Sequence, residues 1–263
     1  MNPIEQSIKS KIERIGIPLK DWDIKINRGI LTGCNDAFII SEQQRNSILK
    51  NCKSESERRR TDDLIRPILR GRDIKRYGYH FAGLYLIATH NGIPEKDIPR
   101  IDIHDYPAIK AHLDEYWDKI SARADQGDTP YNLRSCAYMD DFSKPYIAYR
   151  EISTFMDACQ IPAGYLITNK SYIITGDNLD FLLVFFNSSL FNNILLKFAN
   201  TTGGKGADFL GNIRLLYPDE KIKQKVKKIL KIGNIDVRTN ESDHLFFDIY
   251  KFTPLERDFI IKK

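Results

Sequence analysis

Apolar residues recur at helical spacing in several stretches of the chain. Isoleucines stand at positions 4, 8, 12 and 15, with Pro18 beyond them, which predicts an amphipathic helix over residues 1–15. Residues 105–124 repeat the pattern behind Asp105 and Pro107, a helix-starting pair. The same reasoning predicts further helices over 41–51, with Ser41 as its N-cap, and over 178–199 and 219–231. A final helix pair over 242–262 is broken at Pro254, and Thr253 with Glu256 forms a capping box at the start of its second half.

Short apolar runs between these helices predict strands. Residues 22–40 read as two short strands joined by a turn at 27–29, with a second turn near 33–35. Four more strands are expected at 81–88, 145–150, 163–167 and 171–175. The strands come in pairs and do not alternate one for one with helices, so we expect an α+β fold with mixed or antiparallel strands and packed helices.

The composition is that of an ordinary globular protein. The chain has 263 residues, of which 42% are hydrophobic and 29% charged, enough for one large domain or two small ones. No apolar run reaches the roughly 18 residues of a membrane span, and no signal peptide is recognisable at Met1, so we interpret the protein as intracellular and cytoplasmic. The four cysteines are too scattered for a zinc site and are expected to be reduced.

Charge is unevenly distributed around a net value of +5. Residues 58–76 contain eight basic and three acidic side chains, and residues 219–231 contain six lysines against two acids. Residues 95–128 are acidic, with nine acids against five bases. Basic faces favour phosphate-rich partners, although a solvated lysine and arginine surface is the alternative.

Familiar catalytic motifs are missing or incomplete. No GxGxxG loop occurs, and Asp128-Thr129-Pro130-Tyr131 only partly matches the tetrad of amino-methyltransferases because Thr129 replaces a proline. Asp219-Glu220-Lys221 lacks the spacing of a metal-dependent nuclease centre. The Gly-rich stretch 201–206 is not a nucleotide-binding loop, but its Lys205 is a candidate for one DNA phosphate, with a flexible turn as the alternative.

Several segments together resemble a known family. The most specific are residues 26–40 (INRGILTGCNDAFII) and 65–74 (IRPILRGRDI) with Tyr77. Further matching segments are 106–113, 123–138 around Thr129-Pro130-Tyr131-Asn132-Leu133-Arg134, 144–152, and 172–188 with Tyr217-Pro218. In this order they resemble the TaqI-like C-terminal specificity domain, which is the target-recognition domain of type IIG restriction-modification enzymes.

This resemblance implies a reader of double-stranded DNA and no catalytic centre in these residues. In that family the domain follows an adenine-N6 methyltransferase domain and often a nuclease domain. S-adenosylmethionine and Mg²⁺ are therefore expected only on such missing catalytic parts, which are the expected protein partner. We divide the chain into a recognition domain over 1–218 and a helical C-terminal tail over 219–263 that packs on it or on a partner.

Candidate contact residues follow from base and phosphate chemistry. Arginine can bond guanine with two N–H groups, and Asn or Gln can bond adenine in the same way. The base-reading candidates are Arg28, Gln126, Asn132, Arg134 and Arg150. The phosphate-binding candidates are Arg70, Arg72, Lys75, Arg76, Lys144 and Lys205, with Asp73 expected to brace one of the arginines.

Two other functions stay open at this point. The chain is alternatively a standalone specificity subunit that mainly assembles methylase or nuclease chains, although only one recognition half is visible. A hydrolase built from scattered histidines and carboxylates is the third possibility.

Overall fold

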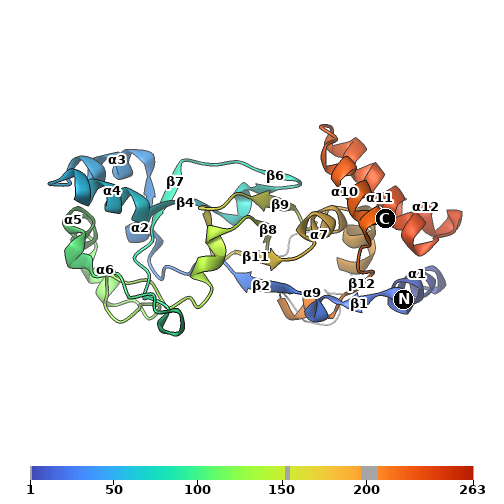
Figure 1. Ribbon diagram of the computed structural model, residues 1–263, viewed down its shortest axis with the longest axis horizontal. Coiled ribbons are helices and arrows are strands. Elements are labelled where there is room, and N and C mark those ends of the chain that lie inside the picture. The colour runs from blue at the N-terminus through green and yellow to red at the C-terminus, as the bar shows by residue number, and fades with distance from the viewer. Residues whose placement is uncertain (1, 152–154, 197–206, 263) are drawn as a thin grey trace.

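A four-stranded antiparallel sheet lies at the centre of the molecule. The computed structural model describes residues 2–151, 155–196 and 207–262. The order of the strands is β2 (Ile24–Arg28), β11 (Ser171–Gly176), β8 (Tyr146–Arg150) and β9 (Ala158–Ile161). Helices gather at both ends of this sheet, which gives the molecule its elongated shape (Figure 1).

Both faces of the central sheet are buried. Tyr149 and Ile174 point into one hydrophobic core, whereas their neighbours Ala148 and Ile173 point into a second core. Successive side chains of a strand alternate between the faces, so β8 and β11 each contribute to both cores. This is why β8 and β11 read as continuous apolar runs in the sequence.

The second core lies under a mixed sheet and five helices. The sheet order is β10 (Leu166–Ile167), β4 (Ile65–Leu69), β7 (Leu84–Ile87) and β3 (Ile39–Ser41); only the β10–β4 pair is parallel. The accompanying helices are α2 (Asn35–Phe38), α3 (Glu42–Lys50), α4 (Glu55–Leu64), α5 (Pro107–Asp114) and α6 (Trp117–Ser121). Ser41 caps α3 with the predicted side-chain bond to the N–H of Gln44.

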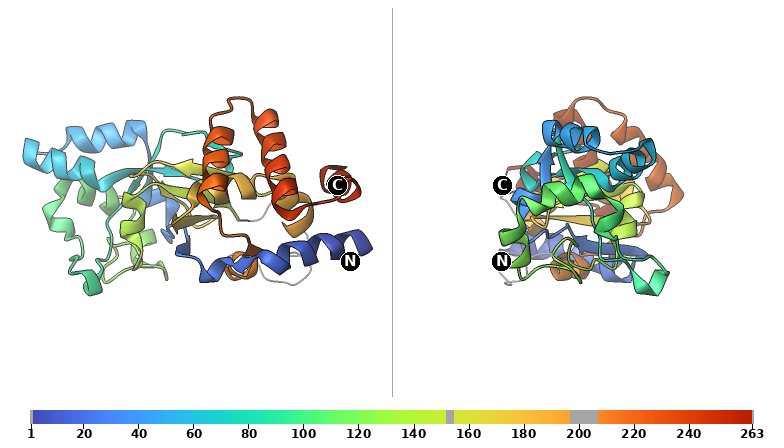
Figure 2. Two further views of the ribbon diagram at one scale, coloured as in Figure 1. Left: turned by 45° about the vertical axis from the view of Figure 1, so that its right-hand side comes forward. Right: turned by 90° about the vertical axis from the view of Figure 1, so that its left-hand side faces the viewer.

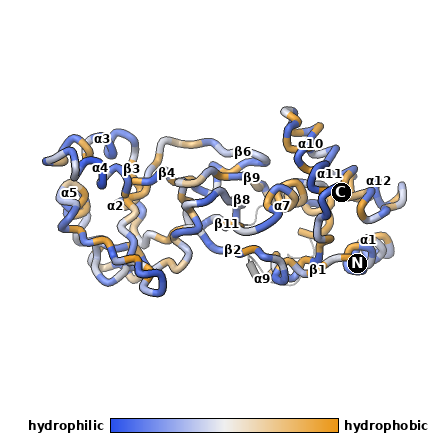
Figure 3. Tube along the Cα trace, viewed as in Figure 1, coloured by the Kyte–Doolittle hydropathy of each residue, from blue (hydrophilic) through white to orange (hydrophobic). Residues whose placement is uncertain are grey.

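The first core holds the other helices. These are α1 (Pro3–Ile15), α7 (Leu179–Phe186), α9 (Ala207–Asn212), α10 (Glu220–Leu230), α11 (Ile235–Tyr250) and α12 (Pro254–Lys262), with a π-helical turn at Leu190–Leu195. Both chain ends lie at this end of the molecule (Figure 2). Along α10 hydrophilic and hydrophobic residues alternate because only one face, with Val226 and Ile229, is buried (Figure 3).

Two short strand pairs complete the fold. β1 (Ile17–Pro18) pairs with β12 (Arg214–Leu215), and β5 (Ile74–Lys75) pairs with β6 (Gly78–Tyr79). The β5–β6 hairpin reaches α11, where the Tyr77 hydroxyl lies 3.1 Å from the Ser242 hydroxyl. The predicted α+β class with a helical C-terminal part is confirmed.

The structure corrects three sequence predictions. The expected helix over 178–199 is broken at Asn187, whose side chain bonds to the backbone N–H and C=O of Ala158 on β9. Helical turns resume at Leu190–Leu195, and residues 197–199 lie outside the described residues. The helix over 105–124 is interrupted near Tyr116, whose ring packs on His112. The hairpin expected within 22–40 does not form, since β2 pairs with the distant strand β11 and the chain then turns into α2.

Candidate nucleic-acid interface

The turn 168–170 between β10 and β11 lies between two hollows that contain basic side chains. The Thr168 N–H bonds to Leu69 O and the Asn169 N–H bonds to Ile30 O, each at 3.0 Å. Gly29 lies against the same turn so closely that an added Cβ would stand 2.2 Å from Thr168 O. This close approach brings the ends of β2, β4 and β11 together, and the turn forms one wall of two hollows that share Asn169.

The first, here called the Arg28 hollow, has a volume of about 450 Å³. It is lined by the 28–31 segment, by residues 134–138 and by Asn169. Arg28 and Arg134 face it from opposite segments, so two predicted base-reading candidates, 106 positions apart in the sequence, share one site.

Arg28 is held in place by a carboxylate and a backbone oxygen. Its Nη2 donates to Glu151 Oε1 at 2.6 Å, and its Nε donates to the backbone oxygen of Asn169 at 2.9 Å. The guanidinium carbon also lies 5.7 Å from the centre of the Tyr172 ring. The side chain is nevertheless 48% exposed, so part of the guanidinium is open to a ligand.

Arg134 is held more loosely than Arg28. It is 62% exposed, and its Nη1 donates to Asp125 at 3.2 Å. Beside it, burial raises the pKa of the Cys136 thiol to about 11 and that of the Tyr138 hydroxyl to about 12. Both groups therefore stay protonated at neutral pH, and they act as neutral hydrogen-bonding groups.

The second, here called the Arg72 hollow, has a volume of about 520 Å³. It is lined by Asn35, Asp36, Ile39, residues 70–72 and residues 168–170. Arg70 makes two bonds to the Asp73 carboxylate, at 2.8 and 2.9 Å, which confirms that Asp73 braces an arginine. Arg72 and Lys170 are exposed and form no ion pair with any residue in the described ranges.

Asn132 is a corrected prediction. Its side chain is 2% exposed, donates to Ile101 O at 2.9 Å and accepts from the Thr129 hydroxyl at 2.6 Å. Its backbone oxygen accepts from buried Arg123, which also bonds to the backbone oxygens of Thr32 and Pro130. The bonds of segment 129–132 therefore stabilise the fold, and the amide of Asn132 is not accessible to a base.

The remaining base-reading candidates lie outside the two hollows. Gln126 is half-buried, and its backbone forms a bridge with Leu133. Arg150, at the end of β8, pairs with Asp157 on the β8–β9 connection. Strand β11 lies between β8 and β2, the strand that carries Arg28. Arg150 lies at the same end of the sheet as the 168–170 turn, because it is in register with Ser171.

The remaining phosphate candidates are dispersed. Lys75 is exposed on the β5–β6 hairpin, and Arg76 lies next to it. Burial raises the pKa of the Asp243 carboxyl on α11, and Arg76 is one of the groups that partly oppose this shift. Lys144 is exposed just before β8. Lys205 lies outside the described residues.

The basic run 58–76 is not one continuous surface. Arg59 pairs with Glu55 within α4, and Arg60 donates to the backbone oxygen of Asp105. Of this run, residues 70–72 line the Arg72 hollow.

Sequence reasoning missed Asn35, Asn169 and Lys170. The available signal was the polar stretch 168–170 between two predicted buried strands, since polar loops next to rigid strands are where binding residues concentrate. Nothing local shows that this turn packs against Gly29 and Gly71.

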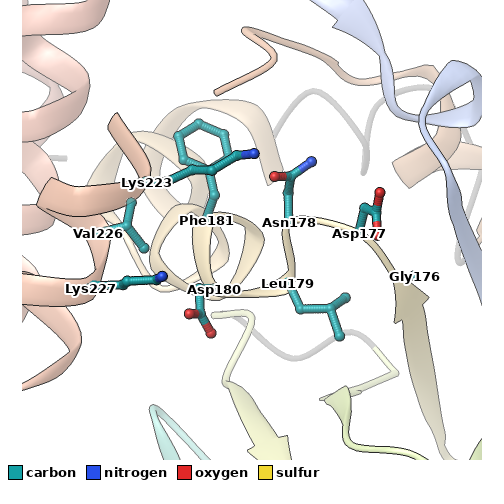
Figure 4. A pocket seen from close by; sticks show the side chains of 9 residues that line it. All are labelled: Gly176, Asp177, Asn178, Leu179, Asp180, Phe181, Lys223, Val226 and Lys227. Carbon is teal, nitrogen blue, oxygen red and sulfur yellow. The ribbon is translucent and has the colours of Figure 1, made fainter. Parts of the chain in front are cut away.

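A third hollow, of about 260 Å³, lies between α7 and α10. Asp177 and Asp180 line it together with Lys223 and Lys227, as Figure 4 shows. Because carboxylates and ammonium groups are mixed here, this hollow is less suited to a polyanion than the Arg72 hollow.

In the described part of the chain, no group of three His, Cys, Asp or Glu side chains is arranged to hold a metal ion. Over the same ranges, every helix is too short or too polar to cross a bilayer.

No protein-family model matches the chain, and no curated protein sequence matches it. Its fold is similar to part of the type IIL restriction-modification enzyme MmeI, solved in complex with DNA, with a TM-score of 0.62 over 93% of this chain at 13% identity. The type IIG restriction endonuclease BpuSI matches with a TM-score of 0.49 over 97% of this chain at 15% identity. The chain spans 35% and 33% of those two chains. It therefore has a fold similar to that of a segment of the restriction-modification enzyme MmeI.

Proposed function

We propose that this chain is the double-stranded DNA recognition domain of a type II, IIG-like restriction-modification enzyme. In this role it directs an adenine-N6 methyltransferase or endonuclease to its site. The observation that carries the proposal is the pair of basic hollows at the 168–170 turn, lined by cations from four distant segments. The fold supports it, because the similar segment belongs to an enzyme solved in complex with DNA.

The two hollows suit different parts of a DNA duplex. Arg72 and Lys170 are exposed cations without an ion-pair partner among the described residues, and such groups bind phosphates by charge. Arg28, Arg134 and Asn169 combine guanidinium and amide groups, which read base edges. We therefore assign the phosphate backbone to the Arg72 hollow and the base edges to the Arg28 hollow.

Catalysis belongs to other domains or subunits in this proposal. S-adenosylmethionine and Mg²⁺ would be bound there, by a methyltransferase or nuclease partner. The four free cysteines fit an intracellular, cytoplasmic site of action on DNA.

The test is selection of the chain against a randomised duplex pool, followed by a salt titration of the best binder. We expect an enriched motif of a few base pairs. With three to five phosphate contacts, the slope of log affinity against log salt should be about −3 to −5. A chain that enriches no motif and shows no salt dependence contradicts the proposal.

A charge-matched pair of variants sharpens this test. The double variant Arg72→Ala/Lys170→Ala should make the slope shallower by about 2 while keeping the motif. The control, Lys225→Ala/Lys228→Ala, removes two exposed charges from α10 and should leave the slope unchanged. Equal effects of the two double variants would mean that only overall charge matters.

A second function, assembly of methylase or nuclease chains, is favoured by one observation. Large apolar side chains are exposed near the C-terminus, at Ile235, Val237, Leu255 and Ile261. If these residues contact a catalytic subunit, Leu255→Ser should weaken its co-purification without changing the motif selected on DNA.

A further inference from the structure

Only some of the N–H donors of Arg28 form hydrogen bonds with the residues that the structure describes. A guanidinium has five N–H groups in a fixed plane, on Nε, Nη1 and Nη2. Asn169 O accepts from Nε and Glu151 accepts from Nη2. Nη1 forms no hydrogen bond with any residue of the described ranges.

The two acceptors of Arg28 come from neighbouring segments of the fold. The Glu151 N–H bonds to Lys170 O at 3.0 Å, so Glu151 stands directly beside the turn that carries Asn169. Partners that lie this close together fit the edge formed by Nε and one N–H of Nη2. The other edge, with Nη1 and the second N–H of Nη2, is left for the Arg28 hollow.

That free edge has the geometry of a guanine reader. Its two parallel N–H groups match the O6 and N7 acceptors that guanine presents in the major groove. Glu151 also neutralises the guanidinium, which makes Arg28 a weak general attractor of phosphates. The contact with the Tyr172 ring and the two hydrogen bonds, to Asn169 O and Glu151, fix the plane of the Arg28 guanidinium before DNA binds.

We propose that Arg28 reads one guanine of the target site through this free edge, with Glu151 and the backbone oxygen of Asn169 as positioning groups. This inference rests on the proposed function, and it specifies which base Arg28 recognises. It distinguishes Arg28 from Arg72 and Lys170, whose contribution should be independent of sequence.

The experiment repeats the duplex selection with wild type, Arg28→Ala and Arg28→Lys. Affinity is then measured for the consensus duplex and for duplexes in which each guanine in turn is replaced by 7-deazaguanine, which lacks the N7 acceptor. At one guanine, the replacement should weaken wild-type binding several-fold. Replacing that guanine by another base should cost about 5- to 150-fold.

In Arg28→Ala the same replacements should have no effect, and that position of the consensus should become degenerate. Arg28→Lys keeps the charge but loses the fork, so it should show the same degeneracy with an unchanged salt slope. Circular dichroism melting of each variant verifies that it is folded.

The positioning role has its own readout. Glu151→Ala should reduce discrimination at this one guanine, whereas Glu151→Gln should restore most of it because its amide oxygen still accepts from Nη2. A purely structural role for Glu151 would instead lower affinity for every sequence equally.

The outcomes distinguish failure of the proposed DNA-recognition function from failure of the role assigned to Arg28. If wild type enriches no motif, the proposed function and this inference fail together. If wild type has a motif that Arg28→Ala leaves unchanged, or if Arg28→Ala loses affinity uniformly with a salt slope shallower by about one, only this inference is overturned.

Discussion

At the residue scale, side chains of the same type are buried at one position and exposed at another. Arg123 is 7% exposed, stacks on the Phe38 ring at 4.5 Å and bonds to backbone oxygens of three turns. Arg134, eleven positions later, is 62% exposed with one carboxylate partner. A buried arginine such as Arg123, whose Nη1 and Nη2 donate to backbone oxygens, stabilises the fold, whereas an exposed one remains available to a ligand.

The contrast between Asn132 and Arg134 gives a first prediction. Asn132→Ala should lower the free energy of unfolding by about 1–3 kcal/mol, because it leaves buried partners unsatisfied. Arg134→Ala should change it by less than about 0.5 kcal/mol while weakening binding to the selected duplex. Urea unfolding and DNA affinity, measured on both variants, check this. Equal stability loss in the two would contradict the assignment.

A second prediction concerns the close approach at Gly29. Gly29→Ala should destabilise the chain by about 3 kcal/mol, because the new methyl group would overlap Thr168 O, which is backbone and cannot swing away. Gly78→Ala is the control, since nothing lies within 4 Å of a Cβ there. Urea midpoints of the two variants give the comparison. Similar midpoints would show that the turn can shift away from Gly29.

At the scale of elements, the ends of the chain are joined by one carboxylate. Glu256 closes the predicted capping box of α12 by accepting from the Thr253 N–H at 2.7 Å. It also accepts from Ser7 at 2.7 Å and from Lys11 at 2.6 Å, both on α1. The C-terminal helix is thereby fixed to the N-terminal one.

This junction predicts a pH dependence. Burial alone would raise the pKa of Glu256, but the hydrogen bonds from Lys11, Ser7 and Thr253 outweigh it and hold the pKa below its ordinary value of 4.5. The unfolded chain therefore binds the proton more readily, so this stabilisation is present above pH 4.5 and is lost as the pH falls through the lowered pKa. Glu256→Gln should cost about 1–3 kcal/mol at neutral pH, and much less at about pH 3.

The control for this junction is Asp258→Asn, which removes an exposed pair with Lys262 on the same helix. Because exposed pairs contribute little, its stability should follow wild type at every pH. Urea unfolding across the pH range measures both. A gap between wild type and Glu256→Gln that stays constant down to pH 3 would rule out the ionised carboxylate as the cause.

At the scale of the whole molecule, the central sheet joins two cores. Tyr149 and Ile174 belong to one core and Ala148 and Ile173 to the other, along the same two strands. Loss of either core would expose one full face of this sheet to water. The free energy of burying apolar surface therefore couples the two ends of an elongated molecule.

This coupling predicts one cooperative unfolding transition. Trp22 is buried in the first core and stacks with Phe181, whereas Trp117 lies on α6 at the other end and packs on Tyr131. In Trp22→Phe and in Trp117→Phe, the remaining tryptophan should give the same urea midpoint as far-UV circular dichroism. A Trp117 signal that changes at lower urea than circular dichroism would mean that the α2–α6 end unfolds separately.

The sequence by itself determined the local elements and the local pairs. Helix α10, the caps at Ser41 and Thr253, the strands β8 and β11, and the Arg70–Asp73 pair depend on residues a few positions apart, and pattern and capping rules describe such short-range interactions. The α+β class followed from the order of these elements.

Only the tertiary structure decided which polar side chains line the two hollows. It paired β2 with β11, 143 or more positions away, seated the 168–170 turn against Gly29, and buried Asn132 while leaving Arg28 and Arg134 open. These outcomes depend on which strand offers a matching buried face and on how closely two backbones approach. Both are properties of packing between distant segments, and no window of the sequence contains them.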